Sequence, residues 1–335
     1  MSNEIPKAEK LIQRIFSINS PDDFVETTLD VFQFQYEHNG LYKEFASLLG
    51  CNPKNIRRIE DIPFLPVSFF KTHKVQATLF EPQVIFTSSG TSGSTTSSHY
   101  IKDVHVYEYS FKRTFQELYG QVTDYCILAL LPSYLERQGS SLVYMVKQLM
   151  KESGHPLNNF FLNNFYELSI TLAELERQKQ KTLFIGVTYA LLEFAVKHPT
   201  NLQHTIVMET GGMKGRKKEM IRGEVHHELQ KSFKIKSIHS EYGMTELLSQ
   251  AYSKGDGLFS TPPWMKILIR DEDDPLQLLL VAVATGGINI IDLANIYSCS
   301  FISTEDIGRS YPDGSFEVLG RMDNSDIRGC SLLAI

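Results

Sequence analysis

The sequence predicts an α/β protein with a largely parallel, helix-covered sheet and a smaller β-rich subdomain. Between residues 80 and 250, short apolar runs such as "YCILALL", "TLFIG" and "HTIVME" alternate with amphipathic helical segments. That alternation is typical of strands joined by crossover helices. After Pro262 the helical pattern stops, and short β-like runs such as "MKILIR", "INIID" and "FEVLG" follow.

Helix signals mark the first part of the chain. Leu11, Ile12 and Ile15 recur at helical spacing, and Ser20 followed by Pro21 predicts the start of a second helix. The pattern predicts four parts. They are a mainly helical segment over 1–80, an α/β core over 81–260, a β-rich subdomain over 261–325 and a tail over 326–335.

Composition limits the class of partner and the location. The 335 residues are 42% hydrophobic, which is enough for a buried core, and the net charge of -6 argues against a nucleic-acid partner. The longest apolar runs, "CILALL" and "LLLVAVA", are too short to cross a bilayer, so we expect a cytoplasmic protein without membrane insertion. Its four cysteines lack the spacing of a zinc site or a disulfide scaffold, which predicts free thiols.

Three chemically equipped loops follow predicted strands. They are "TSSGTSGSTTSS" after "QVIF", "GGMKGR" after "HTIVMET", and "EYGMTE" after "KIKSIH". The first has two interpretations. Its Gly, Ser and Thr content suits a flexible linker, whereas small residues also free backbone N–H groups and hydroxyls to bind phosphate. In parallel sheets, ligands bind at the carboxyl ends of strands, which favours the second interpretation when the loops are taken together.

The ordered set resembles the adenylate-forming superfamily of acyl-CoA synthetases, firefly luciferases and peptide-synthetase adenylation domains. "TSSGTSGS" resembles its phosphate-binding loop, "YGMTE" its adenine and magnesium motif, "STEDIGR" its ribose-binding segment and "GRMDNSDIRG" its hinge motif. Within the superfamily, "LPSYLERQGSSLVYM" and "IRGCSLL" resemble the LuxE acyl-protein synthetases of bacterial bioluminescence. The resemblance covers most of the chain and implies the N-terminal domain fold of these enzymes.

The resemblance implies that ATP and Mg²⁺ activate a carboxylic acid as an acyl-adenylate. A fatty acid is favoured and an aryl acid is an alternative. Thr245 would bind the α-phosphate, and Glu246 would bind the metal. The remaining nucleotide contacts would come from Ser88, Ser89, Gly90, Thr91, Ser92 and Gly93 for the phosphates, from Gly211, Gly212, Tyr242 and Gly243 for the adenine, and from Asp306 and Arg321 for the ribose.

Two departures from the superfamily pattern bear on the reaction. Ser94 stands where a lysine is common, so Lys214 or Arg216 would have to neutralise phosphate charge. The chain also ends at Ile335, so the usual C-terminal subdomain is expected to be absent or vestigial. The LuxE-type synthetases share this feature and pass the acyl group to a cysteine near their C-terminus, a position that Cys330 matches.

Two other functions stay open at this stage. One is a ligase of the phenylacetate-CoA type that transfers the acyl group to CoA or to a carrier protein. The other is a non-catalytic scaffold that binds a nucleotide or an acyl-adenylate. By family analogy, a reductase is a further possible acceptor of the acyl group.

Overall fold

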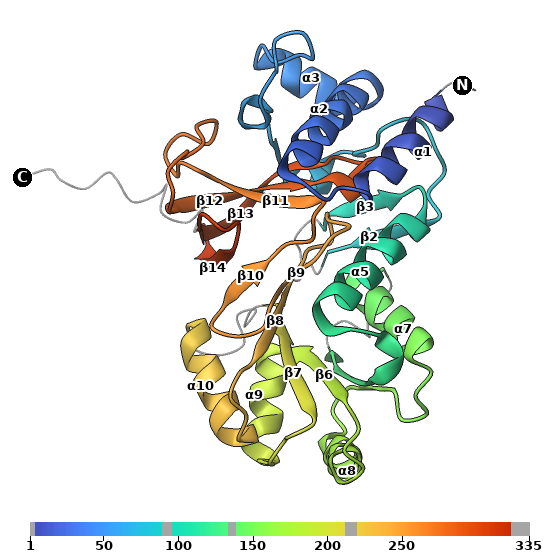
Figure 1. The fold of residues 1–335 in the computed structure, drawn as a ribbon, viewed down its shortest axis with the longest axis vertical. Helices are drawn as coiled ribbons and strands as arrows, with labels where there is room; N and C mark the ends of the chain where they lie inside the picture. Colours follow the sequence, from blue (N-terminus) through green and yellow to red (C-terminus); the bar gives the residue numbers. More distant parts are fainter. Residues whose placement is uncertain (1–3, 89–95, 133–138, 212–219, 323–335) are drawn as a thin grey trace, which may run out of the picture.

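A single large sheet organises the protein. The computed structural model describes residues 4–88, 96–132, 139–211 and 220–322 (Figure 1). The sheet has 12 strands, 11 of them in one continuous order and β1 (Leu65–Pro66) beside β13. The order is β11 (Met265–Arg270), β12 (Ala284–Asp292), β13 (Phe301–Ser310), β14 (Phe316–Arg321), β10 (Leu258–Ser260), β9 (Ala251–Ser253), β8 (His239–Tyr242), β7 (Thr205–Thr210), β6 (Thr182–Val187), β4 (Cys126–Leu130) and β5 (Asn159–Phe161).

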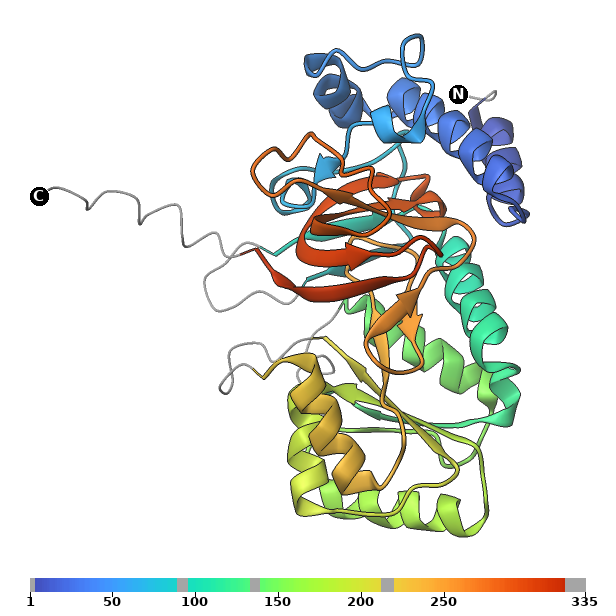
Figure 2. The ribbon, with the colours of Figure 1, turned by 60° about the vertical axis from the view of Figure 1, so that its left-hand side comes forward.

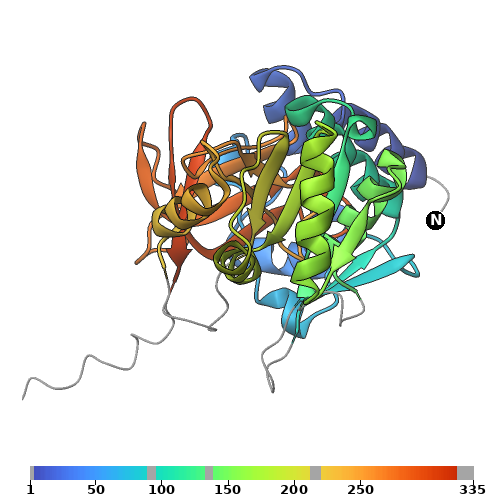
Figure 3. The same ribbon diagram turned by 90° about the horizontal axis from the view of Figure 1, so that it is seen from below.

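The strands from β5 to β8 are parallel and form the α/β half of the sheet. Their crossovers are α7 (Ser141–Ser153), α8 (Phe165–Arg177), α9 (Thr188–Lys197) and α10 (Arg222–Phe233). β6 is buried throughout, because helices cover both faces of this half (Figure 3). The chain runs from β4 outward to β5 and then back across β4 to β6, which creates a topological switch point between β4 and β6.

The remaining strands pair in antiparallel fashion from β8 onward, except that β1 lies parallel to β13. This half contains the β-like runs predicted after Pro262. The predicted mixture of a parallel, helix-covered sheet and a β-rich region is therefore confirmed.

Two predicted strand positions differ from the structure. The strand before the hydroxyl-rich loop, β2 (Val84–Thr87), pairs only with β3 (Ser98–Ile101) and lies outside the main sheet. Its partner is the chain that returns from the same loop, so a local hairpin satisfies its backbone. Thr87 also donates its N–H to the carbonyl of Gly139. The strand predicted at "KIKSIH" starts only at the last residue of that run, His239, and continues as β8.

The predicted N-terminal helices are present as α1 (Glu4–Ile15), α2 (Pro21–His38) and α3 (Gly40–Leu48), with the short α4 (Phe69–Thr72) after them. The Ser20 hydroxyl accepts from the backbone N–H of Asp23, which caps α2 as predicted. A further helix, α5 (Val104–Tyr119), ends at Gly120, which has a φ of 87°. Within the described ranges, no helix is long and apolar enough to span a bilayer.

The N-terminal helices lie against the antiparallel half of the sheet (Figure 2), and a buried glutamine joins the two. Gln35 on α2 is fully buried. Its Nε2 donates to the carbonyls of Asn295 and Ile296, both at 3.1 Å, and its Oε1 accepts from the N–H of Ser300 at 2.9 Å. The side chain therefore satisfies backbone groups of a turn that lies 260 residues away along the chain.

Replacing Gln35 by Ala will remove its hydrogen bonds to the Ile296 carbonyl and the Ser300 N–H, while the Asn295 carbonyl keeps its bond from Ser298. We expect the free energy of unfolding to fall by about 3 kcal/mol, measured by urea denaturation. Gln33 is the matched control, since it lies on the same helix and is exposed. Gln33→Ala should change stability by less than about 0.5 kcal/mol. Equal effects of the two substitutions would contradict this account of how α2 is attached.

Candidate active site

The predicted site residues that the structure describes gather at the carboxyl ends of β7 and β8. Tyr242 is the last residue of β8, and Gly211 directly follows β7. Because β7 and β8 are parallel neighbours, the loops that follow them leave the same edge of the sheet. Asp306 on β13 lies at the same place, where its carboxylate accepts a hydrogen bond from the Tyr242 hydroxyl.

Tyr242, Asp306 and Arg321 form one cluster. The Tyr242 hydroxyl donates to Oδ2 of Asp306 at 2.8 Å, and Nε of Arg321 lies 3.6 Å from Oδ1 of the same carboxylate. Burial raises the pKa of Asp306, whereas the Tyr242 hydrogen bond and the Arg321 charge oppose that rise. Asp306 and Arg321 are register partners of β13 and β14, which explains their proximity.

Glu246 lies beside this cluster, and its side chain is buried. Burial raises its pKa, while a hydrogen bond from Ser97 and the charge of Lys71 favour the carboxylate. Lys71 Nζ is also 3.9 Å from Glu305 Oε1, and Glu305 Oε2 accepts from Arg321 Nη2 at 3.0 Å. The cluster therefore alternates acidic and basic groups.

Lys71, Ser97 and Glu305 were not predicted as site residues. Lys71 belongs to α4, and only the tertiary structure places its charge beside Glu246. Glu305 stands next to the predicted Asp306 within "STEDIGR" and was available as a signal.

A buried histidine, His99, contacts the "YGMTE" loop. His99 on β3 is buried, with Nδ1 2.8 Å from the carbonyl oxygen of Thr245 and Nε2 2.9 Å from Oδ1 of Asn295. Asn295 Nδ2 donates to the carbonyls of Glu246 and Cys299, at 2.7 and 2.9 Å. Burial lowers the pKa of His99 to about 4, although both oxygen contacts favour the protonated ring. These contacts attach the "YGMTE" loop to the β2–β3 hairpin.

The base of the predicted phosphate loop is closed by a pair of serines. Ser88 Oγ accepts from the N–H of Ser97 at 2.8 Å, and the N–H of Ser88 donates to the Ser97 carbonyl at 3.1 Å. Ser97 therefore connects this loop base to Glu246. Several predicted residues lie outside the described ranges; they are Ser89, Gly90, Thr91, Ser92, Gly93, Ser94, Gly212, Lys214, Arg216 and Cys330.

Two buried glutamates lie under the same edge of the sheet. Burial and the neighbouring Glu209 raise the pKa of Glu241 to about 7, against a hydrogen bond from Thr210. For Glu209, burial raises the pKa, but a hydrogen bond from His226 and the charge of Arg222 lower it overall. The carboxylate of Glu241 also lies close to Gly243, one of the predicted site residues.

A Cβ at Gly243 would lie 2.6 Å from Glu241 Oε1, so a larger residue there would have to displace this buried carboxylate. Gly211 has a φ of 68°, a left-handed conformation that also favours glycine. Its carbonyl accepts from the hydroxyl of Thr188 at 2.5 Å. Both glycines therefore have a backbone role before any ligand is considered.

Glu246 is the residue predicted to hold a metal ion. Across the part of the chain that the structure describes, no group of three or more His, Cys, Asp or Glu residues has the arrangement of a metal site. Mg²⁺ in nucleotide enzymes needs only one or two protein carboxylates, with phosphate oxygens and water as its other ligands. Glu246 suits that donor set.

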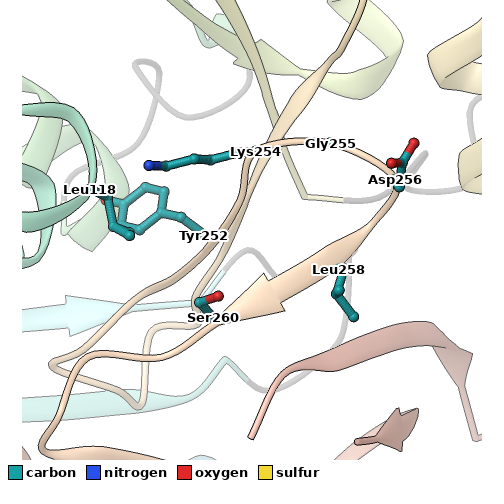
Figure 4. Close-up of a pocket in the computed structure, with 7 residues that line it drawn as sticks. All are labelled: Leu118, Tyr252, Lys254, Gly255, Asp256, Leu258 and Ser260. Atoms are coloured by element: carbon teal, nitrogen blue, oxygen red, sulfur yellow. The ribbon is translucent and has the colours of Figure 1, made fainter. Parts of the chain in front are cut away.

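An open hollow lies away from this cluster, at the β9–β10 turn (Figure 4). Its lining includes Leu118, Tyr252, Lys254 and Asp256, none of which is a predicted site residue. Lys254 directly follows β9, and Ser253 of that strand pairs with Ser240, near the start of β8, whereas Tyr242 is at its end. The hollow is therefore a separate feature of the surface.

A known protein family matches most of the chain. The family described as "Acyl-protein synthetase, LuxE" matches residues 16–334. The chain belongs to this LuxE family. The match includes all the residues of the cluster described above, and it also spans Cys330. A search of curated proteins gives no match.

Solved structures give the fold. The chain is similar to ATP-bound MatB from Rhodopseudomonas palustris, with 16% identity, a TM-score of 0.54, and coverage of 73% of this chain and 50% of MatB. It is also similar to 2-hydroxyisobutyryl-CoA ligase in complex with 2-HIB-AMP and CoA, with 14% identity, a TM-score of 0.64, and coverage of 92% and 70%. This LuxE-family chain therefore has the fold of these ligases and spans about half the length of MatB.

The low pKa of His99 predicts a pH dependence of stability. Its folded pKa of about 4 lies below the ordinary value of 6.5, so the neutral ring stabilises the fold above pH 6.5. That contribution is lost as the pH falls through 4, and amounts to about 3 kcal/mol between these values. Denaturation across this range should show that His99→Gln loses less stability on acidification than the wild type. The exposed His227→Gln should behave as the wild type, and identical pH profiles for all three would contradict the prediction.

Proposed function

We propose that this LuxE-family protein uses ATP to activate a carboxylic acid as an acyl-adenylate and then transfers the acyl group to Cys330. The observation that carries the proposal is the convergence of Glu246, Lys71 and Asp306 at one edge of the sheet. The carboxylate of Glu246 would contact the metal, the ammonium group of Lys71 would contact the phosphates, and the carboxylate of Asp306 would contact the ribose.

In the adenylation step, an oxygen of the substrate carboxylate attacks the α-phosphorus of ATP. The new bond is P–O, and the bond to the β-phosphate oxygen breaks to release pyrophosphate. Thr245 and Ser88 would donate to phosphate oxygens, and Lys71 would offset their negative charge. A bound Mg²⁺, held by Glu246, would share that charge. The protein thus acts mainly by positioning the reactants.

The adenosine part of ATP would lie on the opposite side of the "YGMTE" loop from the phosphates. The ring of Tyr242 would face the adenine, with Gly211 and Gly243 allowing the main chain to approach the base. Asp306 would accept from the ribose hydroxyls, with Arg321 beside it. Asp306 suits this role because its carboxylate is held in place by the Tyr242 hydroxyl.

The transfer step needs a thiol nucleophile. The Cys330 thiolate would attack the acyl carbon, forming a C–S bond while the bond from that carbon to the AMP oxygen breaks, and the thiol proton would go to solvent. The described cysteines are poor alternatives. Burial raises the pKa of Cys126 and of Cys299 to about 12, and it also raises the pKa of Cys51.

The acid and the final acceptor belong to the same proposal. A fatty acid is our first choice, because of the family relation. We expect an acyl-accepting reductase as the partner. We also expect a cytoplasmic location, which suits free cysteines. The likeness to a ligase bound to 2-HIB-AMP and CoA supports a second candidate function, in which CoA takes the acyl group. Consumption of the adenylate by free CoA would distinguish the two.

Adenylation can be measured as acid-dependent exchange of pyrophosphate into ATP, screened over fatty and aryl acids. Glu246→Gln should reduce the exchange rate by roughly 100-fold, because a neutral amide binds the metal and balances its charge poorly. Glu228→Gln on the exposed face of α10 should exchange at the wild-type rate. An active Glu246→Gln protein would refute the metal role, and an absence of exchange with every acid would favour the scaffold function.

Transfer can be followed with radiolabelled acid and ATP. After denaturation, label should remain on the wild-type protein as a hydroxylamine-sensitive thioester. Cys330→Ala should lose that label while it retains pyrophosphate exchange, because only the second step needs the thiol. Cys51→Ala is the matched control and should keep the label. Label that persists in Cys330→Ala would sink the transfer step and leave adenylation standing.

A further inference from the structure

A buried arginine lies beneath the ribose-side cluster. Arg270 is the last residue of β11, and only 4% of it is exposed. Its Nη1 donates to the carbonyl of Ile288 at 2.8 Å and to Oδ1 of Asn289 at 2.9 Å, and its Nη2 donates to the carbonyl of Thr304 at 2.6 Å. These hydrogen-bond partners are all neutral, and the charge of Asp306 opposes the lowering of the Arg270 pKa by burial. Burying a cation is costly, so a structural reason for its position is needed.

The reason lies in an irregularity between β12 and β13. Gly287 pairs with Ile307, whereas Asn289 pairs with Ser303. Ile288 is therefore opposite three residues of β13, which are Thr304, Glu305 and Asp306. This bulge interrupts the hydrogen-bond ladder at the residues that form the acidic part of the site.

The guanidinium replaces the missing ladder bonds. Arg270 binds one carbonyl on each of the two strands at the bulge, that of Ile288 on β12 and that of Thr304 on β13. The Thr304 hydroxyl also donates to Ile288 and accepts from the N–H of Asp306 at 3.1 Å. A planar fork with several donors can span two strands in this way, whereas a lysine cannot.

A glycine on β12 makes room for this side chain. A Cβ at Gly287 would lie 2.5 Å from Cζ of Arg270, and a Cβ at the neighbouring Gly286 would lie 2.2 Å from the backbone oxygen of Arg270. The strand β12 therefore has no side chain where the guanidinium crosses it. Figure 1 shows β11, β12 and β13 side by side in this part of the molecule.

We propose that Arg270 is a positioning residue, which holds the β13 bulge so that the Asp306 carboxylate faces the ribose of a bound nucleotide. The inference rests on the proposed function, because the role of Asp306 as a ribose acceptor is part of that proposal. Arg270 itself contacts no substrate. It acts on recognition through the backbone of Thr304 and the orientation of the two residues that follow.

The test compares binding of ATP and of 2′,3′-dideoxy-ATP to the full chain by calorimetry. The wild type should bind ATP about tenfold more tightly than the dideoxy analogue, since only ATP offers hydroxyls to Asp306. Arg270→Met should lose most of this preference and bind the dideoxy analogue almost unchanged. Arg270→Lys should lie between the two. Arg309→Lys, on the same strand as Asp306, should keep the full preference.

Two further variants make the test specific. Asp306→Ala should remove the preference by itself, and the double variant Arg270→Met/Asp306→Ala should lose no more, because Arg270 acts through Asp306. Gly287→Ala should reproduce the effect of Arg270→Met by displacing the guanidinium, which keeps the test valid if Arg270→Met does not fold. Thermal melting reports folding of each variant.

The outcomes separate the inference from the proposed function. Wild-type protein that binds no ATP would overturn the proposed function and this inference with it. Wild-type protein that prefers ATP, together with Arg270→Met, Arg270→Lys and Gly287→Ala variants that keep the same preference, would overturn the inference alone. A loss of preference in the Arg270 and Gly287 variants, with ATP binding still measurable, would support it.

Discussion

The amide side chain of Asn295 is the junction on which the rest of the site depends. Its oxygen faces His99 on the β2–β3 hairpin, and its nitrogen donates to the carbonyls of Glu246 and Cys299. Its own backbone carbonyl accepts from Gln35 on α2. One residue thus connects the N-terminal helices, the base of the phosphate loop and the "YGMTE" loop. Because these groups are buried, each bond left unmade would carry a full desolvation cost.

A second buried group supports the same loop from the antiparallel half. Asp292 accepts from the backbone N–H groups of Leu248 and Ser249 and from the Ser249 hydroxyl. Ser249 is in turn hydrogen-bonded to the indole of Trp264. Burial raises the pKa of Asp292 to about 6 despite these donors. The loop is therefore fixed by polar contacts on both sides, and a preorganised loop needs little rearrangement to receive a charged ligand.

The sequence predicted the features of the fold that depend on residues close together in the chain. The Ser20 cap and the succession of β7, α10 and β8 depend on local hydrogen bonds and on hydrophobic periodicity, which a single sequence displays. The pairing of β2 was predicted wrongly, because a short apolar run does not reveal whether its partner is a sheet or the returning chain. Lys71, His99 and Arg270 were missed, because their roles come from contacts with distant segments: Lys71 with Glu305, His99 with Asn295 and Arg270 with Thr304.

By itself the sequence determined the fold class, the order of its helices and strands, and the loops rich in glycine, hydroxyl and carboxylate groups. Only the tertiary structure decided which side chains from separate segments meet. Lys71 with Glu246, Tyr242 with Asp306, and Arg270 with the β13 bulge are such pairs. The physical reason is range. Helix caps and strand periodicity are set by neighbours within a few residues, whereas charge neutralisation and carboxylate orientation depend on contacts between elements that pack together only once the sheet is complete.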